Sequence, residues 1–190
     1  MKHIISFIVN ISKAIAAFGI AAGVALAFVN VVARYIFESS LTWASELTIY
    51  LFLWSTFFGA VYCFKKDAHI SVDLLLEKVS PALKKSLILI TLLISTIYVA
   101  AIAYFGYQYV LLYIDLGEIS VDLNIPLWIP YVVVPISFTF SAIVLLYKII
   151  NIITTPANEI KIKSEAEQTL EEFDSEKLLK KVHQKTGGML

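Results

Sequence analysis

The stretch SLILITLLISTIYVAAIAYFGYQYVLLYI, residues 86–114, decides the fold of this chain. Its 29 residues include no Asp, Glu, Lys or Arg. A helix rises ~1.5 Å per residue, so about 20 apolar residues cross the roughly 30 Å hydrocarbon layer of a bilayer. As one helix the stretch would be roughly 43 Å long. We therefore expect it to cross a membrane and to tilt within it or protrude from it.

Three other uncharged stretches accompany it along the chain. Residues 14–33, 47–64 and 123–147 supply 20, 18 and 25 residues, each matching the length of a bilayer core. The composition agrees, because 59% of the 190 residues are hydrophobic and 16% are charged, against about 25% charged in a typical soluble domain. The sequence predicts an all-α integral membrane protein with four transmembrane helices, in a membrane domain of residues 1–155.

Residues 14–33 have a second interpretation as the core of a secretory signal, because Lys2 and Lys13 precede them. Such a core usually has roughly 7–15 residues, and a small-x-small cleavage site follows it. The stretch is longer than that, and it offers no such site before Arg34. We expect it to remain as a membrane span.

The distribution of Lys and Arg orients the four helices, since basic residues are retained on the cytoplasmic side. The 34–46 connection carries Arg34 alone, and the 115–122 connection carries no basic residue. Lysines gather instead near the N-terminus, in residues 65–85 and from Lys148 onward. Both termini and the 65–85 connection are therefore expected in the cytoplasm, and the other two connections outside.

The basic connection predicts an amphipathic helix in the cytoplasmic interface. Its apolar residues recur at the spacing of one helical stripe, Ser71 is suited to cap it, and Pro81 limits its far end. Each lysine near anionic lipid contributes about 1 kcal/mol to membrane binding. The residues expected to contact lipid there are Lys65, Lys66, His69, Asp73, Lys78, Lys84 and Lys85.

His69 lies beside Asp67 and Asp73, which leaves a proton relay or a metal ligand open as alternatives to a solvated turn histidine. We interpret it as the solvated turn residue. One cysteine and three scattered histidines make no recognisable metal-ligand pattern. The sequence predicts no metal site and no cofactor.

Small residues mark expected helix contacts. Gly19, Gly23 and Ala27 lie four residues apart on one helix face, and Gly59 is a further candidate in the second span. Such spacing lets another backbone approach closely. It is also common in apolar helices, so we assign it packing and no chemistry.

Pro135 lies inside the fourth span and denies the carbonyl of Tyr131 its helical partner. A kink is therefore predicted. The alternative is a broken helix that exposes backbone to ions, as in some transporters. A bend in a packing helix is the commoner arrangement, and we favour it.

The stretch LTWASE, residues 41–46, predicts the start of the second helix. Thr42 is suited to the N-cap, and Glu46 is expected in the first turn, where the helix dipole favours negative charge. Trp43 suits the headgroup layer. A sharper hypothesis makes Arg34, Trp43 and Glu46 contacts with a partner protein.

The four spans lack the groups that membrane chemistry needs. Transport sites and proton relays usually place ionisable side chains inside the bilayer, and none of the four stretches contains one. They also hold no carboxylate pair, Ser/His arrangement or Cys pair for catalysis. Fifteen basic residues balance fifteen acidic ones, which gives no reason to propose nucleic acid as a partner. We expect a non-enzymatic membrane protein that packs against another chain.

The charged segment 156–190 differs from the rest of the chain. It mixes Lys with Glu and has few regularly spaced apolar residues. A marginal cytoplasmic helix and disorder are equally compatible with it.

Several short motifs, in this order, resemble the small membrane subunit of tripartite ATP-independent periplasmic (TRAP) transporters, the DctQ-like small permease. They are WASE at 43–46, FGA at 58–60, HISVDLL at 69–75, and IPLW at 125–128 followed by Pro135. Each motif is weak alone, and their order and spacing across four spans make the match specific. The resemblance covers roughly residues 14–150.

The resemblance implies a bacterial inner-membrane protein that serves as a stationary scaffold. It implies a large elevator-type membrane subunit that carries the substrate and sodium sites, and a periplasmic substrate-binding protein that delivers an organic acid. Arg34, Trp43 and Glu46 map to the outer region, and His69 and Asp73 to the cytoplasmic helix. The alternative is an autonomous homo-oligomeric four-span transporter or channel, and a membrane enzyme comes third.

Overall fold

The computed structural model describes residues 2–66 and 79–156 of the chain. They form α1 (Lys2–Ile36), α2 (Thr42–Lys65), α4 (Pro81–Leu116), α5 (Trp128–Tyr131) and α6 (Val133–Thr154). Four helical segments are long and apolar enough to cross a membrane: His3–Ile36, Thr42–Lys65, Pro81–Leu116 and Trp128–Thr154. The predicted all-α fold with four membrane-spanning helices is confirmed for the described part of the chain.

The predicted interfacial helix lies mainly outside the described residues, as do His69, Asp73 and Lys78. The segment 157–190 also lies outside them. Pro81, expected to limit that helix, is the first residue of α4, where its missing N–H costs no intrahelical hydrogen bond.

Helix ends differ from the charge-free stretches in ways that have physical causes. The first helix begins at Lys2 and the third at Pro81, because a lysine in a helix does not end it and its long stem extends along apolar surface. The fourth span begins at Trp128 rather than at residue 123. Residues 117–127 before it form a folded loop with an isolated bridge between Ile119 and Pro126.

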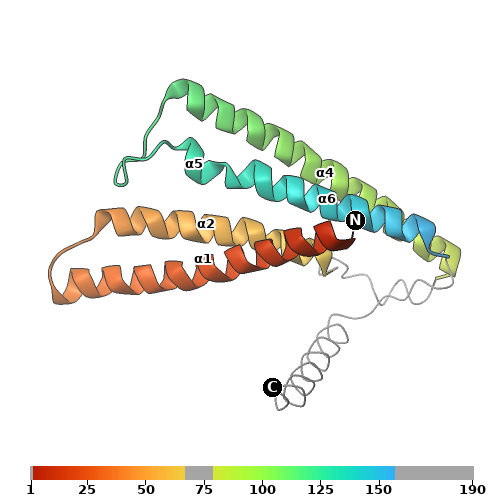
Figure 1. Ribbon diagram of the computed structural model, residues 1–190, viewed down its shortest axis with the longest axis horizontal. Coiled ribbons are helices and arrows are strands. Elements are labelled where there is room, and N and C mark those ends of the chain that lie inside the picture. Colours follow the sequence, from red (N-terminus) through yellow and green to blue (C-terminus); the bar gives the residue numbers. More distant parts are fainter. Residues whose placement is uncertain (1, 67–78, 157–190) are drawn as a thin grey trace, which may run out of the picture.

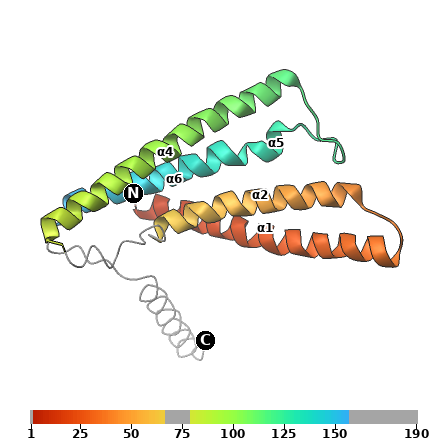
Figure 2. The same cartoon turned by 180° about the vertical axis from the view of Figure 1, so that it is seen from behind.

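The helices pack in the order α1, α2, α6, α4, with α2 and α6 as the central pair. Figures 1 and 2 show two helical hairpins, α1 with α2 and α4 with α5 and α6. The connections 37–41 and 117–127 lie at one end, which we call the loop end. Lys65 and Lys84 lie toward the opposite end, which we call the lysine end. Residues 2 and 156 both lie at the lysine end. The chain therefore passes between the two ends of the molecule an even number of times.

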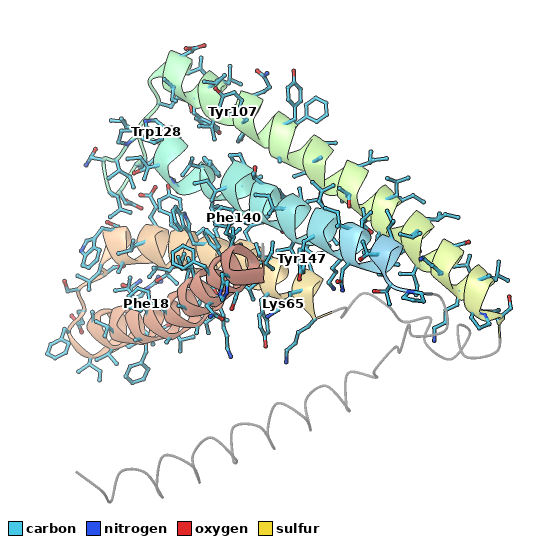
Figure 3. All side chains as sticks on the ribbon, turned by 45° about the vertical axis from the view of Figure 1, so that its right-hand side comes forward. Phe18, Lys65, Tyr107, Trp128, Phe140 and Tyr147 are labelled. Atoms are coloured by element: carbon cyan, nitrogen blue, oxygen red, sulfur yellow. The ribbon has the colours of Figure 1, made fainter. Side chains whose placement is uncertain are left out.

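Buried side chains form two clusters along this row of helices. One joins α1, α2 and α6 through Ile5, Ile8, Val9, Phe58, Val61, Val133 and Val144, and the other joins α4 and α6 through Ile88, Leu92, Val99 and Leu145. Phe140 and Tyr147 of α6 pack on the first cluster, on the side of α6 that faces α1 and α2 (Figure 3). The second helix pair is thereby attached to the first through α6.

The α1–α2 contact is close at two glycines. A methyl group at Gly19 would lie 2.8 Å from the carbonyl oxygen of Leu51, and one at Gly23 would lie 2.6 Å from the ring of Phe52. The nearest atom to such a group at Gly59 is the Cβ of Ala16, at 3.9 Å. Ala27, also expected at a helix contact, is half-buried. The chain's own second helix therefore occupies the glycine face of α1.

Several hydroxyl groups in the spans donate hydrogen bonds to nearby backbone carbonyl groups. Ser12, Thr48 and Thr96 are buried, and each donates to the carbonyl four residues earlier, at 2.8, 2.7 and 2.6 Å. Ser55 instead donates to the carbonyl of Ala16 in α1 at 2.6 Å. Polar groups without partners are expensive in hydrocarbon, and these bonds remove that cost.

Candidate contact site at the loop end

The start of α2 is held by a side chain of α1. The Oδ1 atom of Asn30 accepts the backbone N–H of Leu41 at 3.1 Å, and its Nδ2 donates to Ser45 Oγ at 2.9 Å. Leu41 is the N-cap residue and makes no side-chain cap, and Thr42 is the first helical residue. The expected Thr42 cap is therefore wrong, because an amide from the neighbouring helix satisfies the backbone there.

Glu46 connects α2 with a loop that is 76 residues further along the chain. Its Oε2 accepts the backbone N–H groups of Asp122 and Leu123, both at 2.9 Å. Its Oε1 accepts the hydroxyl proton of Tyr50. Glu46 was expected in the first turn of α2. Because Thr42 is the first helical residue, Glu46 lies beyond that turn. Its charge is stabilised by these donors rather than by the start of its own helix.

The loop that Glu46 holds has a defined backbone. Gly117 ends α4 with φ 62°, in the left-handed region that favours glycine. The N–H of Ser120 donates to the carbonyl of Ile125 at 2.8 Å, and the N–H of Leu127 donates to that of Glu118 at 3.0 Å. Ser120 is 3% exposed, whereas Val121 beside it is 90% exposed. The loop therefore carries an apolar side chain at its tip while its backbone is bonded inward.

The short helix α5 makes its own bond to α2. The indole Nε1 of Trp54 donates to the carbonyl oxygen of Pro130 at 3.0 Å. Val132 alone separates α5 from α6, and it keeps helical torsion angles (φ −61°, ψ −17°) and donates its N–H to the carbonyl of Trp128 at 3.0 Å. Val132 lies one residue after Tyr131, whose carbonyl Pro135 leaves without its usual donor. A methyl group at Gly106 of α4 would lie 3.0 Å from Val134 and 3.3 Å from Pro135, so α4 passes close to the start of α6.

Tyrosines join α4 to α5. The ring of Tyr113 stacks on that of Tyr131 with centroids 5.2 Å apart, and Tyr109 packs edge-on against Tyr113 at 4.8 Å. The hydroxyl oxygens of Tyr109 and Tyr113 are 2.9 Å apart. Tyr107, in contrast, is exposed on the outward side of α4 (Figure 3). The tyrosines at this end thus include a helix–helix contact as well as exposed rings.

The other residues expected to contact a partner at this end lie on the surface. Arg34 is exposed near the end of α1, and Trp43 is 43% exposed at the start of α2. Within residues 2–66 and 79–156, neither forms a hydrogen bond or ion pair. Glu46 is the member of the expected trio whose polar partners belong to its own chain.

At the lysine end, the residues expected to contact lipid behave differently from one another. Lys85 donates to the carbonyls of Ile153 and Thr155 at 3.0 and 2.9 Å, across to the end of α6. Lys66 lies over the ring of Tyr62 at 5.3 Å, with Lys13 at 5.6 Å from the same ring. Lys65 is exposed and points away from the helices (Figure 3), and Lys84 is half-buried.

Within the described ranges, no three His, Cys, Asp or Glu side chains gather as a metal site would need. Cys63 is free and exposed. Sequence reasoning missed Tyr50, Trp54 and Gly106 as parts of this end of the molecule. Their signals were an aromatic one helical turn after Glu46, an indole N–H that requires an acceptor inside a span, and a glycine in a long apolar helix.

Residues 23–155 match a family described as tripartite ATP-independent periplasmic transporters, DctQ component. The chain is 32% identical over 96 residues to the C4-dicarboxylate TRAP transporter small permease protein DctQ of Rhodobacter capsulatus, covering 50% of this chain and 42% of that protein. It is 45% identical over 56 residues to a putative TRAP transporter small permease protein of Haemophilus influenzae, covering 30% and 35%. The ectoine TRAP transporter small permease protein TeaB of Halomonas elongata is 27% identical over 126 residues, covering 66% and 65%. The chain thus spans less than two thirds of the length of each of these relatives.

Proposed function

The chain belongs to the DctQ family of tripartite ATP-independent periplasmic transporters, and from that membership we propose that it is the small scaffold subunit of a sodium-driven importer. The importer takes up an organic acid, such as a dicarboxylate, a sialic acid or a sugar acid. A large elevator-type membrane subunit moves the substrate, and a periplasmic substrate-binding protein delivers it. The family match over residues 23–155, together with four apolar spans, is the observation that carries this proposal.

The interior of the described spans supports a scaffold rather than a transport path. Its buried polar residues are serines and threonines, such as Ser12, Thr48 and Thr96. Their hydroxyls are bound to backbone carbonyls nearby. An ion or an organic acid would need charged or unoccupied polar groups at that depth. The substrate site is therefore assigned to the large subunit.

The outer helices of the row supply the surface for this partner. Large apolar side chains of α1 and α4 are exposed, among them Phe18, Phe28, Ile94 and Phe105, with exposed fractions of 70, 68, 62 and 68%. Of these two apolar surfaces, on α1 and on α4, one would face the lipid and the other would contact the partner subunit. Arg34 and Trp43 extend the contact to the loop end, and the lysines of the opposite end contact lipid headgroups.

The proposed role requires one orientation of the molecule in the bacterial inner membrane. The lysine end faces the cytoplasm together with both termini, because basic residues are retained there. The loop end faces the periplasm, where the binding protein delivers the substrate. Glu118 and Asp122 make the 117–127 loop acidic on that side.

Purification of the tagged chain from its native membrane tests the proposal. One large hydrophobic protein is expected in equal amount, and uptake by the reconstituted pair with its binding protein is expected to require sodium. Recovery of a homo-oligomer alone would favour an autonomous transporter or channel instead. Sodium-independent uptake by the assembled complex would contradict the sodium-driven mechanism while leaving the scaffold role intact.

A further inference from the structure

Aromatic rings of α2 and α6 form part of the contact between the two helical hairpins. Phe57 packs against Phe138 with ring centroids 5.7 Å apart, and Phe58 packs against Phe140 at 6.2 Å. Inside a bilayer such contacts gain little from the exclusion of water, because lipid tails are as apolar as the side chains. Polar bonds between the hairpins therefore matter for how the two are held together.

Among the described residues at the loop end, hydrogen bonds from side chains of α2 cross from the first hairpin to the second. Glu46 accepts two backbone N–H groups of the loop 117–127, both at 2.9 Å. Trp54 donates to Pro130 in α5 at 3.0 Å. The Glu46 bonds are charge-assisted, and such bonds are stronger than those between neutral groups. One helix thus holds both the loop and α5.

The segment 117–131 is connected to its own hairpin in a different way. Tyr131 stacks on Tyr113 of α4, which ties the segment to that helix. It also continues into α6 through Val132, which keeps helical torsion angles and whose N–H donates to the carbonyl of Trp128 at 3.0 Å, although Pro135 leaves the carbonyl of Tyr131 without its usual donor. Without its bonds to α2, the segment would therefore remain attached to both helices of its own hairpin.

We propose that Glu46 and Trp54 form a latch that holds the segment 117–131 on α2, and that opening this latch leaves the segment attached to its own hairpin alone. Both are positioning residues, since they act through the backbone that they hold. The latch sets the distance between the 117–127 loop and the 37–41 connection. It thereby also sets where Val121, 90% exposed at the loop tip, is presented.

Amide hydrogen exchange on the full-length chain, purified with whatever partner accompanies it, tests the latch directly. The N–H groups of Asp122 and Leu123 are protected by Glu46, so Glu46→Ala is expected to speed their exchange about tenfold. Glu46→Gln keeps an acceptor oxygen but loses the charge, and an intermediate rate is expected. Asp115→Asn removes a carboxylate at the same end that bonds to nothing in the described residues, and it should leave the rates unchanged.

A distance measurement tests the release of the segment. Spin labels are attached to Tyr35→Cys and Val121→Cys in a Cys63→Ser background, because both positions are exposed on different hairpins. The combination of Glu46→Gln with Trp54→Phe is expected to broaden the distance distribution and shift it to longer values. Both substitutions retain most of the side-chain volume, so the test does not depend on the more disruptive Glu46→Ala.

Two results would overturn the latch. One is unchanged amide exchange at Asp122 and Leu123 in the Glu46 variants. The other is the same distance distribution with and without Glu46→Gln and Trp54→Phe. Neither measurement requires transport, so a failure of the proposed transporter role and a failure of the latch are distinguishable.

Discussion

Asn30 is the side chain that determines how the first two helices meet at the loop end. It accepts the N–H of Leu41 and donates to Ser45, so it serves α2 as an N-cap does although it belongs to α1. An N-cap residue is worth roughly 0.5–2 kcal/mol relative to Ala. Asn30→Ala is therefore expected to lower the free energy of unfolding by about 1 kcal/mol, measured as a lower thermal midpoint in detergent.

Asn10 provides the matched control for this substitution. It is an exposed asparagine of the same helix, and it makes no hydrogen bond within the described residues. Asn10→Ala should leave the thermal midpoint where it is. Equal midpoints for both variants would show that the Asn30 bonds contribute nothing to stability.

At the scale of helix pairs, the glycines of α1 and α2 are predicted to differ sharply in their tolerance of a methyl group. At Gly19 the added carbon would meet a backbone oxygen at 2.8 Å, which cannot move without moving α2. At Gly23 it would meet the ring of Phe52, which is 37% exposed and can rotate. Overpacking costs about 1–3 kcal/mol. Gly19→Ala is expected to destabilise most and Gly23→Ala less.

Gly59→Ala completes the series as its internal control. The nearest atom to its added carbon is at 3.9 Å, an ordinary contact distance, and alanine is the better helix former by about 1 kcal/mol. Unfolding midpoints of the three variants measure the order directly. A Gly19→Ala variant as stable as Gly59→Ala would mean that the α1–α2 approach is looser than the structure shows.

The second hairpin has its own polar tie at the lysine end. Lys85 of α4 donates to two carbonyls at the end of α6, where the helix dipole is negative. A cation at such a position contributes roughly 0.3–1 kcal/mol. Lys85→Met is expected to lower stability by about that amount and to speed amide exchange at the end of α6. Lys84→Met removes the same charge from the neighbouring position but breaks none of those bonds. If both variants lost the same stability, the loss would come from the charge and not from the hydrogen bonds of Lys85.

For the whole molecule, the sequence predicted the membrane spans, which depend on composition. It did not predict the contacts between segments that are distant along the chain. Charge-free stretches such as residues 86–114 locate a span because the bilayer acts on every residue in the same way. Two of the partners of Glu46 are backbone N–H groups 76 and 77 residues away, and nothing in the side chains of those residues marks them. Thr42 has the composition of an N-cap, and Asn30 of another helix takes that role. Tertiary contacts therefore decided the local structure at the loop end.

The orientation of the whole molecule is the last expectation open to a direct test. Lysines gather at one end of the helices, and the 117–127 loop at the other has none, so we predict that the loop lies outside the cytoplasm. In a Cys63→Ser background, a membrane-impermeant maleimide should label Val121→Cys in intact cells, since that position is 90% exposed. Lys65→Cys, exposed at the lysine end, should react after permeabilisation alone. The reverse pattern would contradict this orientation and would place the lysine end outside the cytoplasm.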